Sequence, residues 1–204
     1  MLARLRQWED WPRVDAIAIT HWHLDHWGDL VPWVWGSMFG LGREAAKPQL
    51  WLPPEGIDLL RTFGERMGTP TMFWNAFDIE EYAEGEPFET VAGLTITAVR
   101  VPHYTLRTFA FRVTDGDKTL AYSGDSAPSD ALAEVARDAD LFVCEATLVD
   151  DQSDGQPRGH LSADEAVTAF KASGAKRLLI THRPEELDLP PELERAQDGL
   201  ELDL

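Results

Sequence analysis

The chain has 204 residues, 44% of them hydrophobic and 26% charged, a composition that suits a globular protein with a sizeable core and excludes a disordered chain. The formal net charge of −18 argues against extended electrostatic binding to a nucleic-acid backbone, because such binding depends on Lys and Arg. No apolar stretch reaches membrane-spanning length, and the first residues lack the apolar segment of a signal peptide. We therefore expect a cytoplasmic protein with no membrane partner.

The first half of the chain alternates strands with helices, which is the pattern of an α/β fold. Leu2, Leu5 and Trp8 have helical spacing and predict the tail of a helix that ends before Pro12. An apolar run rich in β-forming residues predicts a buried strand over 14–20. The next expected elements are a helix from Gly28 to about Gly36, a strand over 49–52 and a helix over 57–67, whereas residues 71–84 have no clear pattern.

The second half begins with an antiparallel β region, in which strands over 94–101 and 107–113 are followed by turn residues and a third strand over 118–122. Ser162 and Glu165 form a capping-box pattern, which predicts a helix ending at Gly174. The other expected elements are a helix over 129–136, strands over 140–144 and 177–181, an exposed loop over 152–158 and a terminal strand over 198–204.

A cluster of metal-binding residue types follows the first predicted strand: His21, His23, Asp25 and His26. Side chains two apart on an extended segment share a face, so His21 and His23 can point the same way. Asp25 and His26 must then turn elsewhere, which suggests two metal positions. Crowding these polar groups at the end of a buried strand is costly unless a cation compensates their desolvation. The alternative is a solvated loop that happens to be rich in His.

Three further predicted strands end at residues of the same kind, namely His103, Asp125 and His182. Active sites of layered α/β folds collect at one edge of the sheet, so we expect these side chains to converge with the first cluster. Cys144 is the only cysteine, which excludes an intramolecular disulfide and a zinc–thiolate cluster. A metal must therefore be held by His and carboxylate side chains.

These motifs resemble the metallo-β-lactamase-fold hydrolase superfamily, and within it the ribonuclease Z-like and phosphodiesterase branch. The HxHxDH motif of that family is matched by the first cluster, its third-motif histidine by His103, its bridging aspartate by Asp125 and its last ligand by His182. The resemblance implies an α/β fold with a four-layer αβ/βα sandwich, in a single domain over residues 1–204. Because the motif comes after only twenty residues, we expect the chain to be N-terminally truncated and to lack the opening strands of the family.

The resemblance also implies a site for two divalent metal ions, zinc or alternatively manganese. One ion would be held by His21, His23 and His103, the second by Asp25, His26 and His182, and Asp125 would bridge both. Two such ions can share a hydroxide that is a nucleophile at neutral pH. In this family the motif aspartate, here Asp25, orients or deprotonates the attacking water, and a histidine matched by His160 protonates the leaving oxygen or contacts phosphate.

The expected function is hydrolysis of a small or nucleotide-like phosphodiester by a metal-bridging hydroxide, and a homodimer is compatible with the sequence. Residues 143–147 resemble the His-Glu-Ala-Thr segment of ribonuclease Z, but Cys144 replaces its histidine, which argues against literal tRNA processing. Glu145 is expected to orient a ligand imidazole. Tyr104 is one of several aromatic residues near the motifs that fill the core or line a pocket.

Three alternatives stay open at the level of the sequence. An ester, thioester or lactone hydrolase of the same superfamily is disfavoured because those branches commonly have Pro-Gly-His at the third motif, whereas this chain has Val101-Pro102-His103-Tyr104. An iron-dependent oxidoreductase on the same scaffold would act on persulfide or oxygen. The third alternative is a non-catalytic fragment that keeps the site residues but does not fold without its missing strands.

Overall fold

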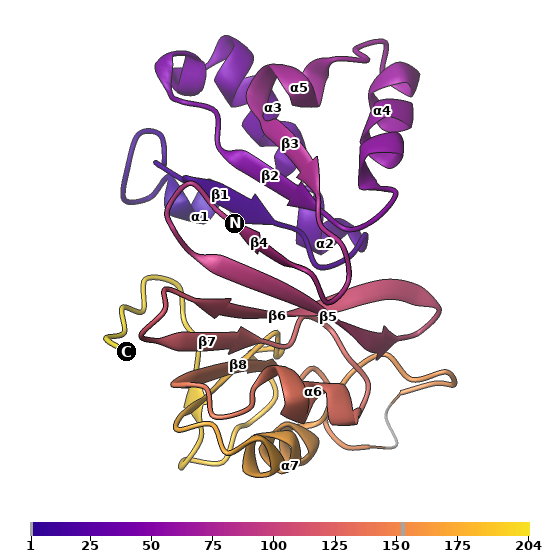
Figure 1. Ribbon diagram of the computed structural model, residues 1–204, viewed down its shortest axis with the longest axis vertical. Coiled ribbons are helices and arrows are strands. Elements are labelled where there is room, and N and C mark those ends of the chain that lie inside the picture. The colour runs from indigo at the N-terminus through magenta and orange to yellow at the C-terminus, as the bar shows by residue number, and fades with distance from the viewer. Residues whose placement is uncertain (1, 152–153) are drawn as a thin grey trace. The chain divides into compact units, whose positions relative to one another are not determined.

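A computed structural model describes residues 2–151 and 154–204 (Figure 1). The chain divides into two compact units, the first formed by Met1–Ala83 with Thr90–Gly93 and the second by Glu84–Glu89 with Leu94–Leu204. Each unit has its own β-sheet. The single domain over 1–204 stays a prediction. The expected loop over 152–158 includes residues 152 and 153, which lie outside the described residues.

The first unit is built on a three-stranded parallel sheet in the order β1-β2-β3. Ile17 lies opposite Leu50, and Leu50 lies opposite Ile79. The strands are β1 (Ala16–Ala18), β2 (Gln49–Leu52) and β3 (Asp78–Glu81). The helices are α1 (Leu2–Leu5), α2 (Leu24–Trp27), α3 (Leu30–Phe39), the 3-10 helix η1 (Leu41–Glu44), α4 (Gly56–Arg66) and α5 (Met72–Ala76).

The core of the first unit is rich in aromatic side chains. Trp33, Phe73 and Phe77 are buried among the aliphatic residues of β1, β2 and α4. Residues 71–84, which had no clear sequence pattern, form α5 and β3, because Phe73, Ala76 and Phe77 are buried by this tertiary packing. The helix expected from Gly28 to about Gly36 is present as α3, and the short helix α2 before it was not predicted.

The second unit contains a seven-stranded mixed sheet in the order β10-β9-β8-β7-β6-β5-β4. The strands β4 to β7 pair antiparallel, and β7 to β10 pair parallel. The β5–β6 hairpin is paired from Thr95 opposite Thr114 to His103 opposite Leu106. The strands are β4 (Pro87–Glu89), β5 (Thr95–His103), β6 (Leu106–Thr114), β7 (Thr119–Tyr122), β8 (Leu141–Glu145), β9 (Leu178–Thr181) and β10 (Glu194–Arg195).

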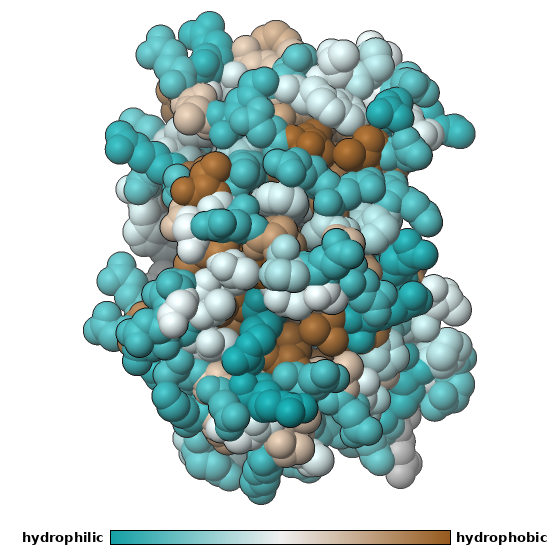
Figure 2. All heavy atoms as spheres, in the orientation of Figure 1, coloured by the Kyte–Doolittle hydropathy of each residue, from teal (hydrophilic) through white to brown (hydrophobic). Residues whose placement is uncertain are grey.

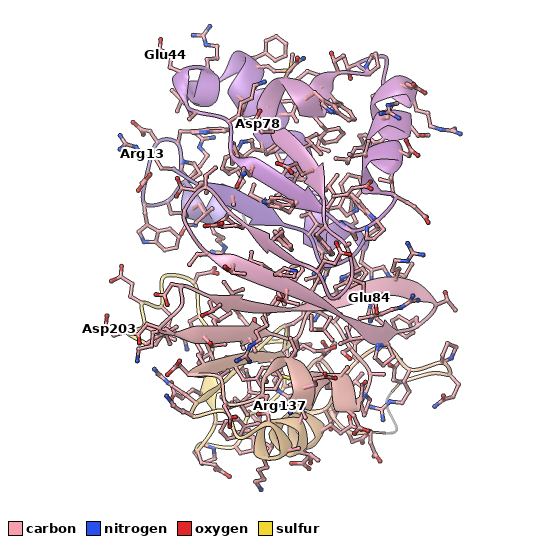
Figure 3. All side chains as sticks on the ribbon, in the orientation of Figure 1. Arg13, Glu44, Asp78, Glu84, Arg137 and Asp203 are labelled. Atoms are coloured by element: carbon pink, nitrogen blue, oxygen red, sulfur yellow. The ribbon has the colours of Figure 1, made fainter. Side chains whose placement is uncertain are left out.

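Two helices, α6 (Asp130–Val135) and α7 (Ala163–Ser173), pack side by side against this sheet, α6 on β5 and β6 and α7 on β8 and β9 (Figure 1). The capping box predicted at Ser162 and Glu165 is present, and Gly174 ends α7 with a left-handed φ of 72°. Arg112 donates to the carbonyl groups of Val135 and Arg137 at the carboxyl end of α6, where Figure 3 labels Arg137.

The terminal strand predicted over 198–204 is wrong, because these residues have no regular secondary structure. Leu200 and Leu204 are 45% and 43% exposed, so their alternation with polar residues does not create a buried face. The sheet ends instead at β10, which pairs with β9 and is held by an ion pair between Arg177 and Glu194. A strand needs a partner, and an alternating sequence does not supply one.

Hydrophilic residues cover most of the face shown in Figure 2, as expected for a chain with 36 acidic residues. Apolar residues appear on that face only in small areas. Among the described residues, no helix combines the length and apolar character needed to cross a membrane.

Candidate metal centre

In the first unit, His21 follows strand β1, and hydrogen bonds fix the backbone just before it. The Ile19 N–H donates to the Trp51 carbonyl and so continues the pairing one residue beyond the strand. The Tyr82 hydroxyl donates to the Ile19 carbonyl at 2.7 Å. His21 is fully buried, and its Nδ1 lies 3.0 Å from the Thr20 hydroxyl. The strand therefore fixes both the place and the orientation of this imidazole.

Helix α2 turns the rest of the motif back toward His21. The His26 N–H donates to the His23 carbonyl at 3.0 Å, and this turn places the His23 and His26 rings 5.0 and 4.1 Å from the His21 ring, centroid to centroid. The Asp25 carboxylate is mostly exposed and lies 3.4 Å from His26 Nε2. All four residues of the motif, His21, His23, Asp25 and His26, thus lie together in this unit, with Asp25 and His26 on the short helix α2.

In the second unit, Asp125 follows β7 and is only 1% exposed. Its Oδ2 lies 3.9 Å from His103 Nε2, 3.9 Å from His160 Nδ1 and 3.8 Å from His182 Nε2. These histidines come from the end of β5, the loop before α7 and the end of β9. One buried carboxylate oxygen is therefore surrounded by three imidazole nitrogens from strands and loops far apart in the sequence.

The second nitrogen of each predicted ligand in this unit has a fixed partner. His103 Nδ1 lies 2.6 Å from the Gly159 carbonyl, which can only accept, so Nδ1 carries a proton and Nε2 has the lone pair in the neutral ring. His182 Nδ1 lies 2.8 Å from the Thr147 hydroxyl. That hydroxyl gives its single proton to Glu145 or to the His182 carbonyl, so it accepts from Nδ1. This is the arrangement that orients imidazoles for metal binding through Nε2.

Glu145 is fully buried, and both of its carboxylate oxygens accept hydrogen bonds beside the site. One carboxylate oxygen accepts from the Ser126 N–H and lies 2.9 Å from His160 Nδ1, and the other accepts from the Thr147 N–H and hydroxyl. Burial lowers the pKa of His160, but the Glu145 carboxylate outweighs it, so this pKa lies above its ordinary value. Glu145 therefore orients His160 directly, rather than a predicted ligand.

The donor set of the second unit fits a divalent metal ion. Asp125 Oδ2, His103 Nε2 and His182 Nε2 are its candidate ligand atoms, whereas His160 Nδ1 is already paired with Glu145. Ligand atoms of a tetrahedral zinc site lie about 3.3 Å apart, close to the 3.8 to 3.9 Å measured around Asp125. Imidazole and carboxylate donors without thiolate suit zinc, manganese or iron. The described partners that sequence reasoning missed are Thr20, Thr147 and Gly159, since hydroxyl and carbonyl groups carry no ligand signature.

A hollow of about 640 Å³ lies beside this group at the β5–β6 turn. Its volume falls within the range of about 300–1,000 Å³ that is typical of ligand pockets. It is lined by Arg100, Val101, Pro102, His103, Tyr104, Thr105, Leu106 and Ser129.

Comparison with known proteins identifies the family of the chain. Residues 1–183 match the family described as the β-lactamase superfamily domain. The chain is 31% identical over 173 residues to the probable metallo-hydrolase YhfI of Bacillus subtilis, covering 84% of the chain and 67% of YhfI. It is 32% identical over 114 residues to a zinc phosphodiesterase ELAC protein 2 homolog of Caenorhabditis elegans, covering 53% of the chain and 14% of that protein.

Solved structures show the same fold. The crystal structure of YhfI superposes with a TM-score of 0.68 at 25% identity, over 84% of the chain and 65% of YhfI. The short form of human tRNase Z superposes with a TM-score of 0.68 at 24% identity, over 92% of the chain and 78% of that enzyme. The chain has the metallo-β-lactamase fold, as its motifs predicted. It belongs to the β-lactamase superfamily, and its relatives there include proteins named as metal-dependent hydrolases.

Proposed function

We propose that the chain is a metal-dependent phosphodiesterase that cleaves a small or nucleotide-like phosphodiester. The observation that carries the proposal is the buried Asp125 carboxylate, whose Oδ2 has three imidazole nitrogens within 3.9 Å. Carboxylate and imidazole donors that converge in a buried site are ligands that divalent cations take in proteins. Relatives named as a probable metallo-hydrolase and a zinc phosphodiesterase support the reaction class. The match covers about two thirds of YhfI, so the activity of the whole protein is a proposal for this chain.

We assign the metal ligands as the motifs indicate. His21, His23 and His103 would hold one ion, Asp25, His26 and His182 the second, and Asp125 would contact both. When bound, divalent ions supply a water of lowered pKa and polarise the phosphoryl group. The partners of His21, His103 and His182 keep their imidazoles oriented for this role.

Two side chains are assigned to the two oxygens of the reaction, Asp25 to the attacking water and His160 to the leaving oxygen. Asp25 is the exposed carboxylate of the motif, and we assign it the orientation of the attacking water. His160 donates from Nδ1 to Glu145, so we assign Nε2 of the doubly protonated ring as the atom that delivers a proton to the leaving oxygen, after which the ring is neutral. The hollow at the β5–β6 turn would receive the organic part of the substrate.

The test is hydrolysis of bis(p-nitrophenyl) phosphate by the purified chain, with zinc or manganese added and then removed by a chelator. We expect metal-dependent turnover that Asp125→Asn lowers by at least about 100-fold. Asp115→Asn serves as the matched control, because Asp115 lies in the turn between β6 and β7, at the other end of β6 from His103.

A p-nitrophenyl thioester and elemental analysis complete the experiment. Thioester turnover without phosphodiester turnover would assign the chain to the ester and thioester hydrolases instead. One iron per chain without hydrolysis would favour an oxidoreductase. A chain that is unfolded by circular dichroism with and without metal would be a non-catalytic fragment.

A further inference from the structure

Tyr104 occupies a strained position beside the proposed proton donor. It lies in the turn between β5 and β6 with φ at 47°, a left-handed value that is uncommon for a bulky residue. The residue is 38% exposed, and the centroid of its ring lies 4.8 Å from that of the His103 ring and 5.5 Å from that of the His160 ring. Such strain persists only where the surroundings hold it, and it concentrates at functional sites.

The Tyr104 hydroxyl reaches the loop that carries His160. It donates to Asp154 Oδ1 at 3.2 Å, and the same oxygen accepts from the Gly155 N–H at 2.8 Å. Asp154 Oδ2 accepts from the Gly159 N–H at 2.7 Å and from the His160 N–H at 3.1 Å. One carboxylate thus links the tyrosine of the hairpin to the backbone of the proposed acid.

Two further contacts join the hairpin turn to this loop. The Tyr104 N–H donates to the Arg158 carbonyl at 3.0 Å. The Tyr104 ring packs on Gly159 so closely that a Cβ at that position would collide with it, so only glycine fits there. The Gly159 carbonyl in turn accepts from His103 Nδ1 at 2.6 Å. Tyr104 therefore holds the loop by three contacts: a hydrogen bond to the Arg158 carbonyl, ring packing on Gly159 and a hydrogen bond to the Asp154 carboxylate.

We propose that Tyr104 and Asp154 are positioning residues that clamp the loop so that the His160 imidazole is held for proton transfer. Glu145 fixes the ring of His160 at Nδ1, whereas Asp154 and Arg158 fix its backbone N–H and carbonyl. Proton transfer requires the donor within hydrogen-bond reach of the leaving oxygen, and a misplacement of about 1 Å can cost about 100-fold in rate. This inference rests on the proposed phosphodiesterase function and assigns two residues that the metal site does not need.

The experiment compares two substrates that differ only in the leaving group: the p-nitrophenyl and the phenyl ester of thymidine 5′-monophosphate. Phenolate is the poorer leaving group, so its departure depends more on a positioned acid. We expect Tyr104→Phe and Asp154→Asn to lower kcat by about 10-fold for the phenyl ester and by less than about 3-fold for the p-nitrophenyl ester, with KM unchanged.

Two controls separate positioning from stability. Asp115→Asn makes the same change in another carboxylate that accepts two backbone N–H groups, from Asp117 and Lys118, and it should leave both substrates unaffected. Metal content and melting temperature are measured for every variant. Tyr104→Phe removes one partly exposed hydroxyl, so we expect this variant to fold and to keep its metal.

The results separate the phosphodiesterase function from the positioning role of Tyr104 and Asp154. A wild-type chain with no metal-dependent turnover of either ester overturns the phosphodiesterase function and this inference with it. An active wild type whose Tyr104→Phe and Asp154→Asn variants lose equal activity on both esters, or none, overturns the positioning role alone. A selective loss on the phenyl ester at unchanged metal content supports it.

Discussion

Asp125 is a charged side chain that the fold buries almost completely, and the environment around it is built from imidazoles. Desolvating a carboxylate costs several kcal/mol unless opposite charge and hydrogen bonds offset the loss. Among the neighbours, His103 and His182 have Nδ1 committed to a carbonyl and a hydroxyl, whereas His160 has Nδ1 committed to Glu145. Two of the three histidines around Asp125 thus have an uncharged partner at Nδ1 and the third has a carboxylate, which indicates two different roles.

This difference makes a prediction for two neighbouring histidines whose rings stack at 5.7 Å. His182→Ala should lower the metal content, because a ligand is lost. His160→Ala should keep the metal content of the wild type and lower kcat by about 100-fold, the effect of losing a general acid. Elemental analysis beside steady-state kinetics checks both. Loss of metal in His160→Ala would make His160 a ligand and remove its assignment as the acid.

Cys144 is the sole thiol of the chain and is fully buried in β8. Burial raises the pKa of this thiol, so both access and thiolate formation are suppressed. Labelling by an aromatic disulfide reagent should be at least about 100-fold slower in the native chain than in urea. Equal rates in the two conditions would show that β8 opens readily.

At the scale of elements, helix α7 is fixed at its start by two linked polar groups. The Ser162 hydroxyl accepts from the Glu165 N–H, and the Glu165 carboxylate accepts from the Ser162 N–H. Arg158 adds two hydrogen bonds of 2.8 Å to the same carboxylate. Because Arg158 also donates to the His160 carbonyl, the helix cap and the loop of the proposed acid form one connected structure.

Removing the cap should cost stability. Ser162→Ala is expected to lower the free energy of unfolding by about 1 kcal/mol, the usual effect of losing an N-cap hydroxyl. Lys171→Ala, an exposed change near the other end of the same helix, should stay within about 0.5 kcal/mol of the wild type. Urea unfolding followed by circular dichroism measures both. Equal effects in the two variants would contradict the capping role.

The Glu165 carboxylate should make the free energy of unfolding depend on pH. Burial raises the pKa of Glu165, but hydrogen bonds from Arg158 and Ser162 outweigh it, so the folded-state pKa lies below the ordinary 4.5. Its stabilisation is therefore fully present above pH 4.5 and is lost as the pH falls through the folded-state value. In metal-free buffer, the stability gap between wild type and Glu165→Gln should shrink below pH 4.5. Glu134→Gln, an exposed change on α6, is the control, and a gap that stays constant with pH would refute the assignment.

At the scale of the whole molecule, the predicted ligands are divided between the two compact units. His21, His23, Asp25 and His26 belong to the first, and His103, Asp125 and His182 belong to the second. The net charge of −18 destabilises the folded chain by self-repulsion, and a bound divalent cation reduces that repulsion. In the proposed function, metal binding is therefore also a source of stability for the chain.

Metal should raise the melting temperature. A ligand that binds only the folded state stabilises it by about 2.7 kcal/mol at 100 times its Kd, and each kcal/mol corresponds to about 2–4 °C for a chain of this size. Zinc should therefore raise the melting temperature by several degrees, and a chelator should reverse the change. The Asp125→Asn variant should respond less. An identical shift in Asp125→Asn would place the bound metal elsewhere.

The sequence by itself was enough for features that depend on local pattern. The strand leading to His21, the hairpin before and after Asp115, the capping box at Ser162 and the resemblance to the metallo-β-lactamase fold were all predicted and are confirmed. Each is specified by residues close together in the chain, because strand periodicity, turn chemistry and helix caps act over a few positions. The metal ligands and the phosphodiesterase reaction stay predictions.

Tertiary structure decided everything that depends on pairing between distant residues. It placed α5 and β3 in the segment without a pattern, and it ended the sheet at β10 rather than at the carboxyl terminus. It also paired Thr147 with His182, Glu145 with His160 and Tyr104 with Asp154. These contacts join segments 15 to 50 residues apart. They form only because the strand register and the packing of loops bring the partners together, which no local pattern encodes.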